Sequence, residues 1–313
     1  MKPANKICLK ELGFLLLFLI LGFLALIPIA LLYVGLYGVF SHIGFSEVFN
    51  DTVGGHVLIW LQDIFIIFLP AYLWCKNRLR RDPLKCYGLR TADWRWILLA
   101  CCTCLTFFVV MDPVSTFFYN YPFPDSIQEV LNQQKVESFE MSQKMMCLTG
   151  VGGFIECVLL VCLSAAVTEE MFFRGALLKG LGLSTLNPHI VAIIVGIVFS
   201  AVHGEYIGFI DRALFGVFAC YLVYWSRSLW PSIALHALNN FLCILQFRAL
   251  PTDYNPLDPA ELTFPWYVSL TGAVALFFLI RRMYEMRENS VTITPVEFTC
   301  PPSEEEEESD TEE

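Results

Sequence analysis

Three groups of polar residues interrupt apolar runs of the sequence, and their residue types are those that hydrolytic chemistry uses. Glu169 and Glu170 stand together in the first group, His203 ends the second, and His236 and Asn240 form the third. A carboxylate can take a proton from water, an imidazole can share that proton, and an amide can donate a hydrogen bond to an oxyanion. Together the three groups indicate a site for water-mediated hydrolysis.

The spacing within two of these groups predicts which side chains share a helix face. Glu170 and Arg174 are four residues apart, which favours an ion pair on one face of a helix. Glu169 lies about 100° further round the same helix and is left for another partner. His236 and Asn240 are also four residues apart and are expected to point into one cavity. The alternatives are a plain charge cluster at a helix end and a histidine that only packs there.

Depth along the helices gives a crude test of whether these groups can meet. At about 1.5 Å per residue, Glu169 and His203 lie roughly 20 and 24 Å from the nearest predicted helix ends on the basic side. Asn240 lies roughly 15 Å from that side and His236 only about 9 Å. On this count Glu169, His203 and Asn240 can meet inside the membrane, whereas His236 lies too close to the basic side to join them.

The composition shows what kind of molecule must position these groups. Of the 313 residues, 56% are hydrophobic and 16% are charged, and the mean hydropathy is +0.59. Soluble domains have about 45–50% apolar and about 25% charged residues, which excludes a soluble globule or a disordered protein. Acidic residues outnumber Lys and Arg by 30 to 20, without a basic stripe for nucleic acid. The composition indicates an integral membrane protein.

Apolar runs long enough to span a bilayer, about 20 residues each, recur along the chain. We predict an all-α, polytopic membrane bundle of about eight transmembrane helices. The first run is too long for the core of a signal peptide and is expected to be retained. The eight runs are residues 13–40, 56–74, 96–119, 150–181, 188–203, 207–225, 231–245 and 264–280.

The distribution of positive charge predicts the orientation. With a cytoplasmic N-terminus, sixteen of the 20 Lys and Arg residues fall on the cytoplasmic side, and the other four are Lys135, Lys144, Arg212 and Arg248. Cytoplasmic loops are enriched in Lys and Arg, so both termini are predicted to be cytoplasmic. The polar stretch 121–144 then lies outside, and we predict one amphipathic helix there.

In chain order the three groups read EExxxR at 169–174, FxxxH at 199–203 and HxxxN at 236–240. This ordered triple, with FRGALL at 173–178 and WPS at 230–232, resembles the CPBP family of intramembrane proteases, also called the Abi or CAAX-protease family. The resemblance covers residues 150–245, and its HxxxN context is most similar to the prokaryotic branch. It implies an intramembrane endopeptidase whose cavity opens to the cytoplasm.

The resemblance also implies a role for each matching residue. Glu169 is expected to activate the attacking water with help from His203, and His236 and Asn240 are expected to stabilise the oxyanion. Glu170 and Arg174 are expected to support the geometry and charge of this site.

The same residues raise the question of a metal. Two His and a Glu form a legitimate zinc set, so zinc held by Glu169, His203 and His236 is the alternative. The sequence lacks the HExxH arrangement, and the helical partner of His236 is Asn240, a poor zinc ligand. We therefore favour chemistry that depends on glutamate without a metal cofactor.

The resemblance divides the chain into three parts. Residues 1–145 hold the first three helices, a basic cytoplasmic loop and the polar outer loop, and residues 146–288 hold the protease core and the last helix. Residues 289–313 form an acidic tail expected to be solvated and disordered. The expected partners are the bilayer of the cell membrane and a membrane-associated or lipidated protein or peptide substrate.

Two functions of other classes compete with the protease reading. A non-proteolytic membrane scaffold or bacteriocin-immunity protein would keep the fold, although a scaffold has no chemical need for Glu169 or His203. A transporter built on buried Glu and His is the other, but the sequence shows no half-and-half hydropathy symmetry to support it.

Overall fold

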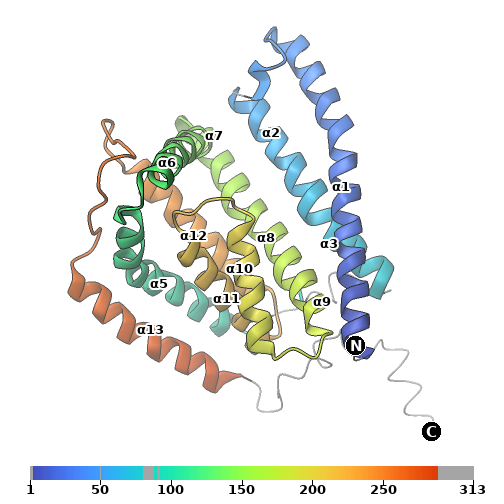
Figure 1. Cartoon of the computed structure of the whole chain (residues 1–313), viewed down its shortest axis with the longest axis vertical. Coiled ribbons are helices and arrows are strands. Elements are labelled where there is room, and N and C mark those ends of the chain that lie inside the picture. Colours follow the sequence, from blue (N-terminus) through green and yellow to red (C-terminus); the bar gives the residue numbers. More distant parts are fainter. Residues whose placement is uncertain (1–2, 50, 80–87, 90–91, 288–313) are drawn as a thin grey trace.

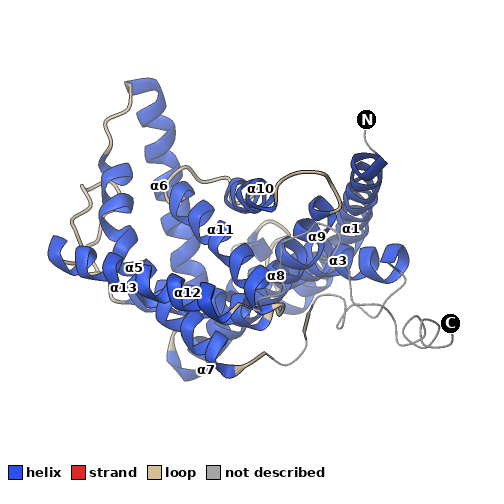
Figure 2. Cartoon of the chain, turned by 90° about the horizontal axis from the view of Figure 1, so that it is seen from below, coloured by secondary structure: helices blue, strands red, loops and turns tan. Residues whose placement is uncertain are grey.

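The computed structural model describes residues 3–49, 51–79, 88–89 and 92–287, and every regular element in these ranges is a helix (Figures 1 and 2). The predicted all-α membrane bundle is thereby confirmed. The predicted disordered tail, residues 289–313, lies outside the described residues. So do five of the basic residues used to predict the orientation: Lys2, Arg80, Arg81, Lys85 and Arg90.

A long helical hairpin forms one edge of the molecule. Its first arm is α1 (Pro3–Ser41), and its second arm runs through α2 (Thr52–Gln62), η2 (Asp63–Phe68), α3 (Leu69–Trp74) and η3 (Cys75–Leu79), where η2 and η3 are π-helical turns. Figure 1 shows both arms in blue. Most of the large apolar side chains of α1 are exposed, as lipid contact requires.

The tip of the hairpin is closed by a short turn, η1 (Glu47–Phe49), and by the N-terminal cap of α2. Asp51 accepts hydrogen bonds from the Gly54 amide at 2.9 Å and from the Tyr37 hydroxyl at 2.6 Å. The hydrogen bond from Tyr37 is the largest cause that lowers the pKa of Asp51. The cap therefore ties α2 to α1.

Two helices of different character follow. The apolar α5 (Trp94–Asn120) packs along α13 (Trp266–Met286) and α12 (Trp230–Arg248), whereas α6 (Asp125–Met146) is polar and buries Leu131. The helix predicted within residues 121–144 is present as α6, whereas its place on the outer side of the membrane stays a prediction. Figure 1 places α6 at the end of the molecule opposite the N-terminus.

The helix that carries the two glutamates is a single rod with two π-helical stretches. It consists of α7 (Gly150–Cys157), η4 (Val158–Ser164), α8 (Ala165–Glu170), η5 (Met171–Leu177) and α9 (Leu178–Gly182). A π turn leaves a carbonyl out of the regular ladder and is frequent at functional sites. Glu169 and Glu170 lie between the two π stretches.

The remaining elements are α10 (Pro188–Ala201), α11 (Phe209–Ser226) and α12 (Trp230–Arg248). The first two pack closely because glycines face each other. A Cβ at Gly196 would lie 2.6 Å from the Ala213 carbonyl oxygen, and one at Gly216 would lie 2.8 Å from the Cα of Gly196. This contact fixes α11 beside α10, whose C-terminal end leads into the turn that carries His203.

Six helices of the described chain are long and apolar enough to cross a membrane: Asn5–Ser41, Val53–Asn77, Trp94–Asn120, Gly150–Gly182, Phe209–Ser226 and Trp266–Met286. All eight predicted runs overlap helices, but α10 has only 14 residues, and α12 is not among the six. The structure therefore supports a multi-pass membrane protein. The exact count of eight and the side on which the termini lie stay predictions.

Candidate active site

Glu170 and Arg174 form the buried centre of the site. The Arg174 Nη1 lies 2.7 Å from Glu170 Oε1, and both side chains are fully buried. The i,i+4 spacing correctly predicted this ion pair. A second guanidinium nitrogen of Arg174 donates to the Gly216 carbonyl at 3.3 Å, so the pair also joins α8 and η5 to α11.

His236 joins this ion pair to the other glutamate. Its Nδ1 lies 2.9 Å from Glu170 Oε1, and its Nε2 lies 3.9 Å from Glu169 Oε2. Because Glu170 is paired with Arg174 and acts as an ionised acceptor, Nδ1 of His236 carries the donated proton. Glu170 therefore holds the imidazole with Nε2 turned toward Glu169.

Glu169 has a different environment from its neighbour. Its Oε2 is buried and accepts no hydrogen bond from the described residues, although about a fifth of the side chain is exposed (21%). The 3.9 Å separation from His236 is too long for a direct hydrogen bond. Because Oε2 is covered, water can reach Glu169 only at the exposed part of its side chain. Glu169 is thus the carboxylate that is free to do chemistry.

The Phe199 ring packs against the basic side chains of the site. His203 and His236 lie with ring centroids 5.1 and 5.8 Å from it, both edge-on. The guanidinium of Arg174 lies 4.4 Å from the ring centroid. His203 also hydrogen-bonds the Phe199 carbonyl through Nδ1 at 2.8 Å. Phe199 therefore positions both imidazoles, which explains why phenylalanine belongs to this motif.

Asn240 is positioned by the π turn of the glutamate helix. Its Nδ2 donates to the Val161 carbonyl, in η4, at 2.8 Å, and its Oδ1 accepts from Asn239 at 3.4 Å. An amide nitrogen has two hydrogens, so one remains for an oxyanion. The oxyanion role of Asn240 stays a prediction.

A cavity of about 310 Å³ lies beside these groups, within the size range of ligand sites. His203, His236, Asn239 and Asn240 are among its lining residues, whereas Glu169 is not. Three of the four predicted catalytic side chains therefore share the cavity, and Glu169 reaches the group through His236. The depth count misplaced His236, which lies at the level of Glu170.

Sequence reasoning missed two polar residues of this region. Asn239 lines the cavity, and only its position next to Asn240 gave a signal. Asp63, buried in η2, accepts a hydrogen bond from Ser164 at 3.1 Å, five residues before Glu169. Nothing in the sequence pairs these two segments.

The donor set does not fit a zinc ion. A catalytic zinc takes three protein ligands, yet no group of three His, Cys, Asp or Glu side chains within the described ranges converges in that way. Both imidazoles use Nδ1 for hydrogen bonds and keep Nε2 free, an arrangement that metal-binding histidines also show, so only the number of converging ligands counts against zinc. Chemistry without a metal stays a prediction.

Comparison with known proteins identifies the segment that contains this site. Residues 152–242 match the Rce1-like family, described as type II CAAX prenyl endopeptidase Rce1-like. The uncharacterized protein YyaK of Bacillus subtilis (strain 168) is 36% identical over 85 residues. That alignment covers 24% of this chain and only 28% of YyaK. No solved structure matches.

Proposed function

We propose that this chain, which belongs to the CAAX-protease family through its Rce1-like segment at residues 152–242, is an intramembrane endopeptidase. The substrate would be a peptide bond of a membrane-associated protein or peptide. The observation that carries the proposal is the division between the two glutamates: Glu170 forms an ion pair with Arg174 at 2.7 Å, whereas Glu169 makes no hydrogen bond with a described residue and lies 3.9 Å from Nε2 of His236.

The reaction we propose begins with a water between Glu169 and His236. Glu169 takes a proton from this water as its oxygen attacks the peptide carbonyl carbon, and a tetrahedral oxyanion forms. Asn240, with its remaining amide hydrogen, and the Nε2 side of His236 would donate to that oxyanion. His236 donates there only as imidazolium, because its Nδ1 proton is already used by Glu170. Glu169 then passes its proton to the leaving nitrogen as the C–N bond breaks.

The Glu169→Gln variant tests the proposal directly. It keeps the shape of the side chain and removes the base, so cleavage should fall by about 10²–10⁴-fold. Membrane proteomes of cells with and without the protein would identify a substrate, and cleavage of that substrate by purified variants would be measured.

Glu156→Gln is the matched control, because Glu156 makes its own pair with His56 at 2.7 Å, away from the cavity. Its cleavage rate should stay near that of the unmodified chain. If Glu169→Gln cleaves as fast as the control, the protease proposal is wrong, and a scaffold or immunity function becomes the better reading.

A further inference from the structure

His203 lies just beyond the end of a regular helix. The helix α10 ends at Ala201, and His203 follows in the turn that leads to α11. The His203 amide donates to the Ser200 carbonyl at 3.3 Å, and the Gly204 amide donates to the Ala201 carbonyl at 3.0 Å. Bonds between residues three apart tighten the last turn of a helix, which is also where helices fray. The position of the His203 backbone therefore depends on what holds the residues that follow it.

A side chain of α6 holds these residues from outside. Nε2 of Gln134 donates to the Gly204 carbonyl at 2.8 Å, and its Oε1 accepts from the Tyr206 amide at 2.9 Å. A glutamine amide carries a donor and an acceptor side by side, so one side chain pairs with the backbone on both sides of Glu205. We call these two hydrogen bonds the Gln134 bracket. Gly204 has a left-handed φ of 71°, a conformation that glycine adopts without steric cost.

The residue inside the bracket is tied to two helices. Ser138 of α6 donates to the Glu205 carboxylate at 2.7 Å, and Nη1 of Arg212, on α11, lies 3.1 Å from the same carboxylate. Nη2 of Arg212 donates to the Glu205 and Ile207 carbonyls at 2.8 and 3.0 Å. The turn after His203 is thus held between α6 and α11, and α6 contributes side chains that no other element of the described chain replaces in these contacts.

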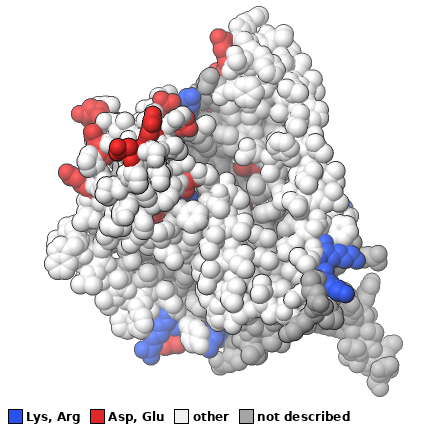
Figure 3. Space-filling view, viewed as in Figure 1, with Lys and Arg blue, Asp and Glu red and all other residues white. Residues whose placement is uncertain are grey.

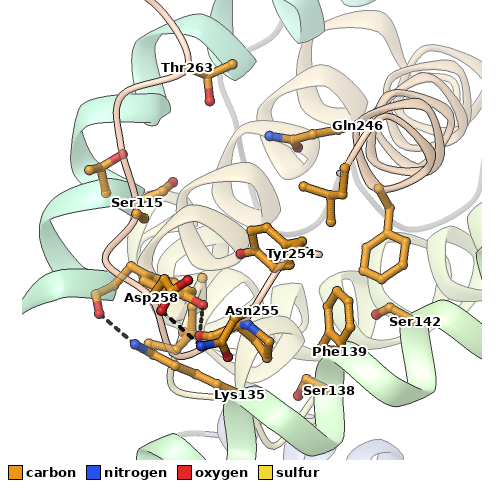
Figure 4. Close-up of a pocket in the computed structure, with 18 of the residues that line it drawn as sticks. Ser115, Lys135, Ser138, Phe139, Ser142, Gln246, Tyr254, Asn255, Asp258 and Thr263 are labelled. Carbon is orange, nitrogen blue, oxygen red and sulfur yellow. Dashed lines mark hydrogen bonds between the residues drawn. The ribbon is translucent and has the colours of Figure 1, made fainter. Parts of the chain in front are cut away.

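The helix that supplies the bracket has two different faces. Figure 3 shows acidic side chains gathered over α6. Gln133 belongs to this exposed face and donates to Glu137 of the same helix at 2.8 Å. The other face lines a cavity of about 820 Å³ with Gln134 and Ser138, and Figure 4 shows Ser138 there. Neighbouring glutamines of one helix therefore have different partners, which makes Gln133 a matched control for Gln134.

We infer that Gln134 is a positioning residue for His203 and acts by holding the turn of residues 202–208. The imidazole is fixed on one side by the Phe199 carbonyl at 2.8 Å, and the bracket fixes the backbone that leaves it on the other side. Gln134 lies outside residues 152–242, the segment that matches the Rce1-like family. The inference rests on the proposed protease function and adds a helix from outside that segment to the site.

Hydrogen exchange tests the bracket without any substrate. Gln134→Met keeps the length of the side chain and removes both hydrogen bonds, and Gln133→Met is its control. Exchange of the Tyr206 amide would be followed by mass spectrometry on purified protein in detergent. It should be faster in Gln134→Met than in the unmodified chain and unchanged in Gln133→Met. Equal exchange in the two variants would show that the bracket does not hold the turn and would overturn the inference.

Cleavage kinetics test whether the bracket acts through His203. The substrate is the peptide identified by the comparison of membrane proteomes. A displacement of about 1 Å can cost about 10²-fold in rate, so kcat of Gln134→Met should fall by about 10–100-fold with KM little changed. In the His203→Ala background the same substitution should change the residual kcat by less than about twofold, because the group that it positions is gone. Gln133→Met should leave kcat unchanged in both backgrounds.

Gln134→Glu keeps the inference testable if Gln134→Met does not fold. It retains the acceptor for the Tyr206 amide and replaces the donor to the Gly204 carbonyl with a carboxylate oxygen, so kcat should again fall only while His203 is present. An unchanged kcat, or an equal loss with and without His203, would overturn the inference. Undiminished cleavage by Glu169→Gln, with faster Tyr206 exchange in Gln134→Met, would refute the protease proposal and leave the bracket intact. The two failures are therefore distinguishable.

Discussion

At the residue scale, the adjacent Glu169 and Glu170 have different roles because their side chains leave the helix about 100° apart. Glu170 points to Arg174 and His236, and its charge is balanced inside the protein. Glu169 points to the other nitrogen of the same imidazole and lacks a cation of its own at hydrogen-bond distance. One residue holds the site together, and the other is left reactive.

The Arg174→Met variant would expose the energetic role of the ion pair. Removing one partner of a buried pair leaves an uncompensated charge and costs about 3–5 kcal/mol. We therefore expect a marked loss of unfolding free energy for purified protein in detergent. The double variant Glu170→Gln, Arg174→Met should recover part of this stability, because no lone charge remains. A double variant less stable than Arg174→Met would contradict the assignment.

The ligand set around His203 and His236 leads to a prediction about metal removal. Because three ligands do not converge in the described residues, cleavage by purified protein should persist after treatment with a strong zinc chelator. The control is a zinc peptidase assayed under the same conditions, which should lose its activity. Activity that disappears with the chelator and returns with added zinc would disprove metal-independent chemistry.

Residue spacing predicted some contacts of the site and not others. The pair Glu170–Arg174 followed from i,i+4 geometry within one helix. The contact of His236 with Glu170 joins residues 66 positions apart and depends on how two helices cross, which spacing does not encode. Asn239 was missed for the same reason, since only the packing shows that both of these adjacent amides line the cavity.

At the scale of elements, the π-helical stretches decide which residues the glutamate helix presents. A regular helix would pair the Val161 carbonyl along its own ladder, whereas here that carbonyl accepts from Asn240 on α12. The length of the apolar run predicted a helix over 150–181, and the helix spans Gly150–Gly182. It could not predict the π turns, because they alter hydrogen bonding without altering the apolar pattern.

The cap at the tip of the α1–α2 hairpin gives a pH-dependent prediction. The folded pKa of Asp51 lies below its ordinary value, so this group stabilises the fold above that value and the contribution is lost as the pH falls through the folded pKa. Protection of the Gly54 amide against hydrogen exchange should therefore fall in acid. Asp51→Asn, which keeps the cap, should lack this dependence, and Asp51→Ala should cost about 0.5–2 kcal/mol at neutral pH, a cost that shrinks in acid. Equal acid sensitivity of Asp51→Asn and the unmodified chain would refute the assignment.

At the scale of the whole molecule, hydropathy predicted where apolar helices occur along the chain because each must be long and apolar to lie in lipid, whereas the predicted count of eight spans stays a prediction beside the six that qualify in the described chain. Hydropathy did not predict the cavity of about 820 Å³ that α6 and the loop of residues 249–265 help to line, two segments separated by four of the predicted spans. Their meeting above the catalytic cavity is a property of the bundle, and neither sequence segment indicates it alone.

The polarity of α12 has a consequence for how the protein is made. This helix carries His236, Asn239, Asn240 and Gln246, and it is not among the helices apolar enough to cross a bilayer by composition. A segment of that kind partitions poorly into lipid when it leaves the insertion machinery alone. Its insertion must therefore wait for neighbours such as α5 and α11, against which it packs. The catalytic centre is therefore assembled in the same step in which α12 enters the membrane and insertion of the protein is completed.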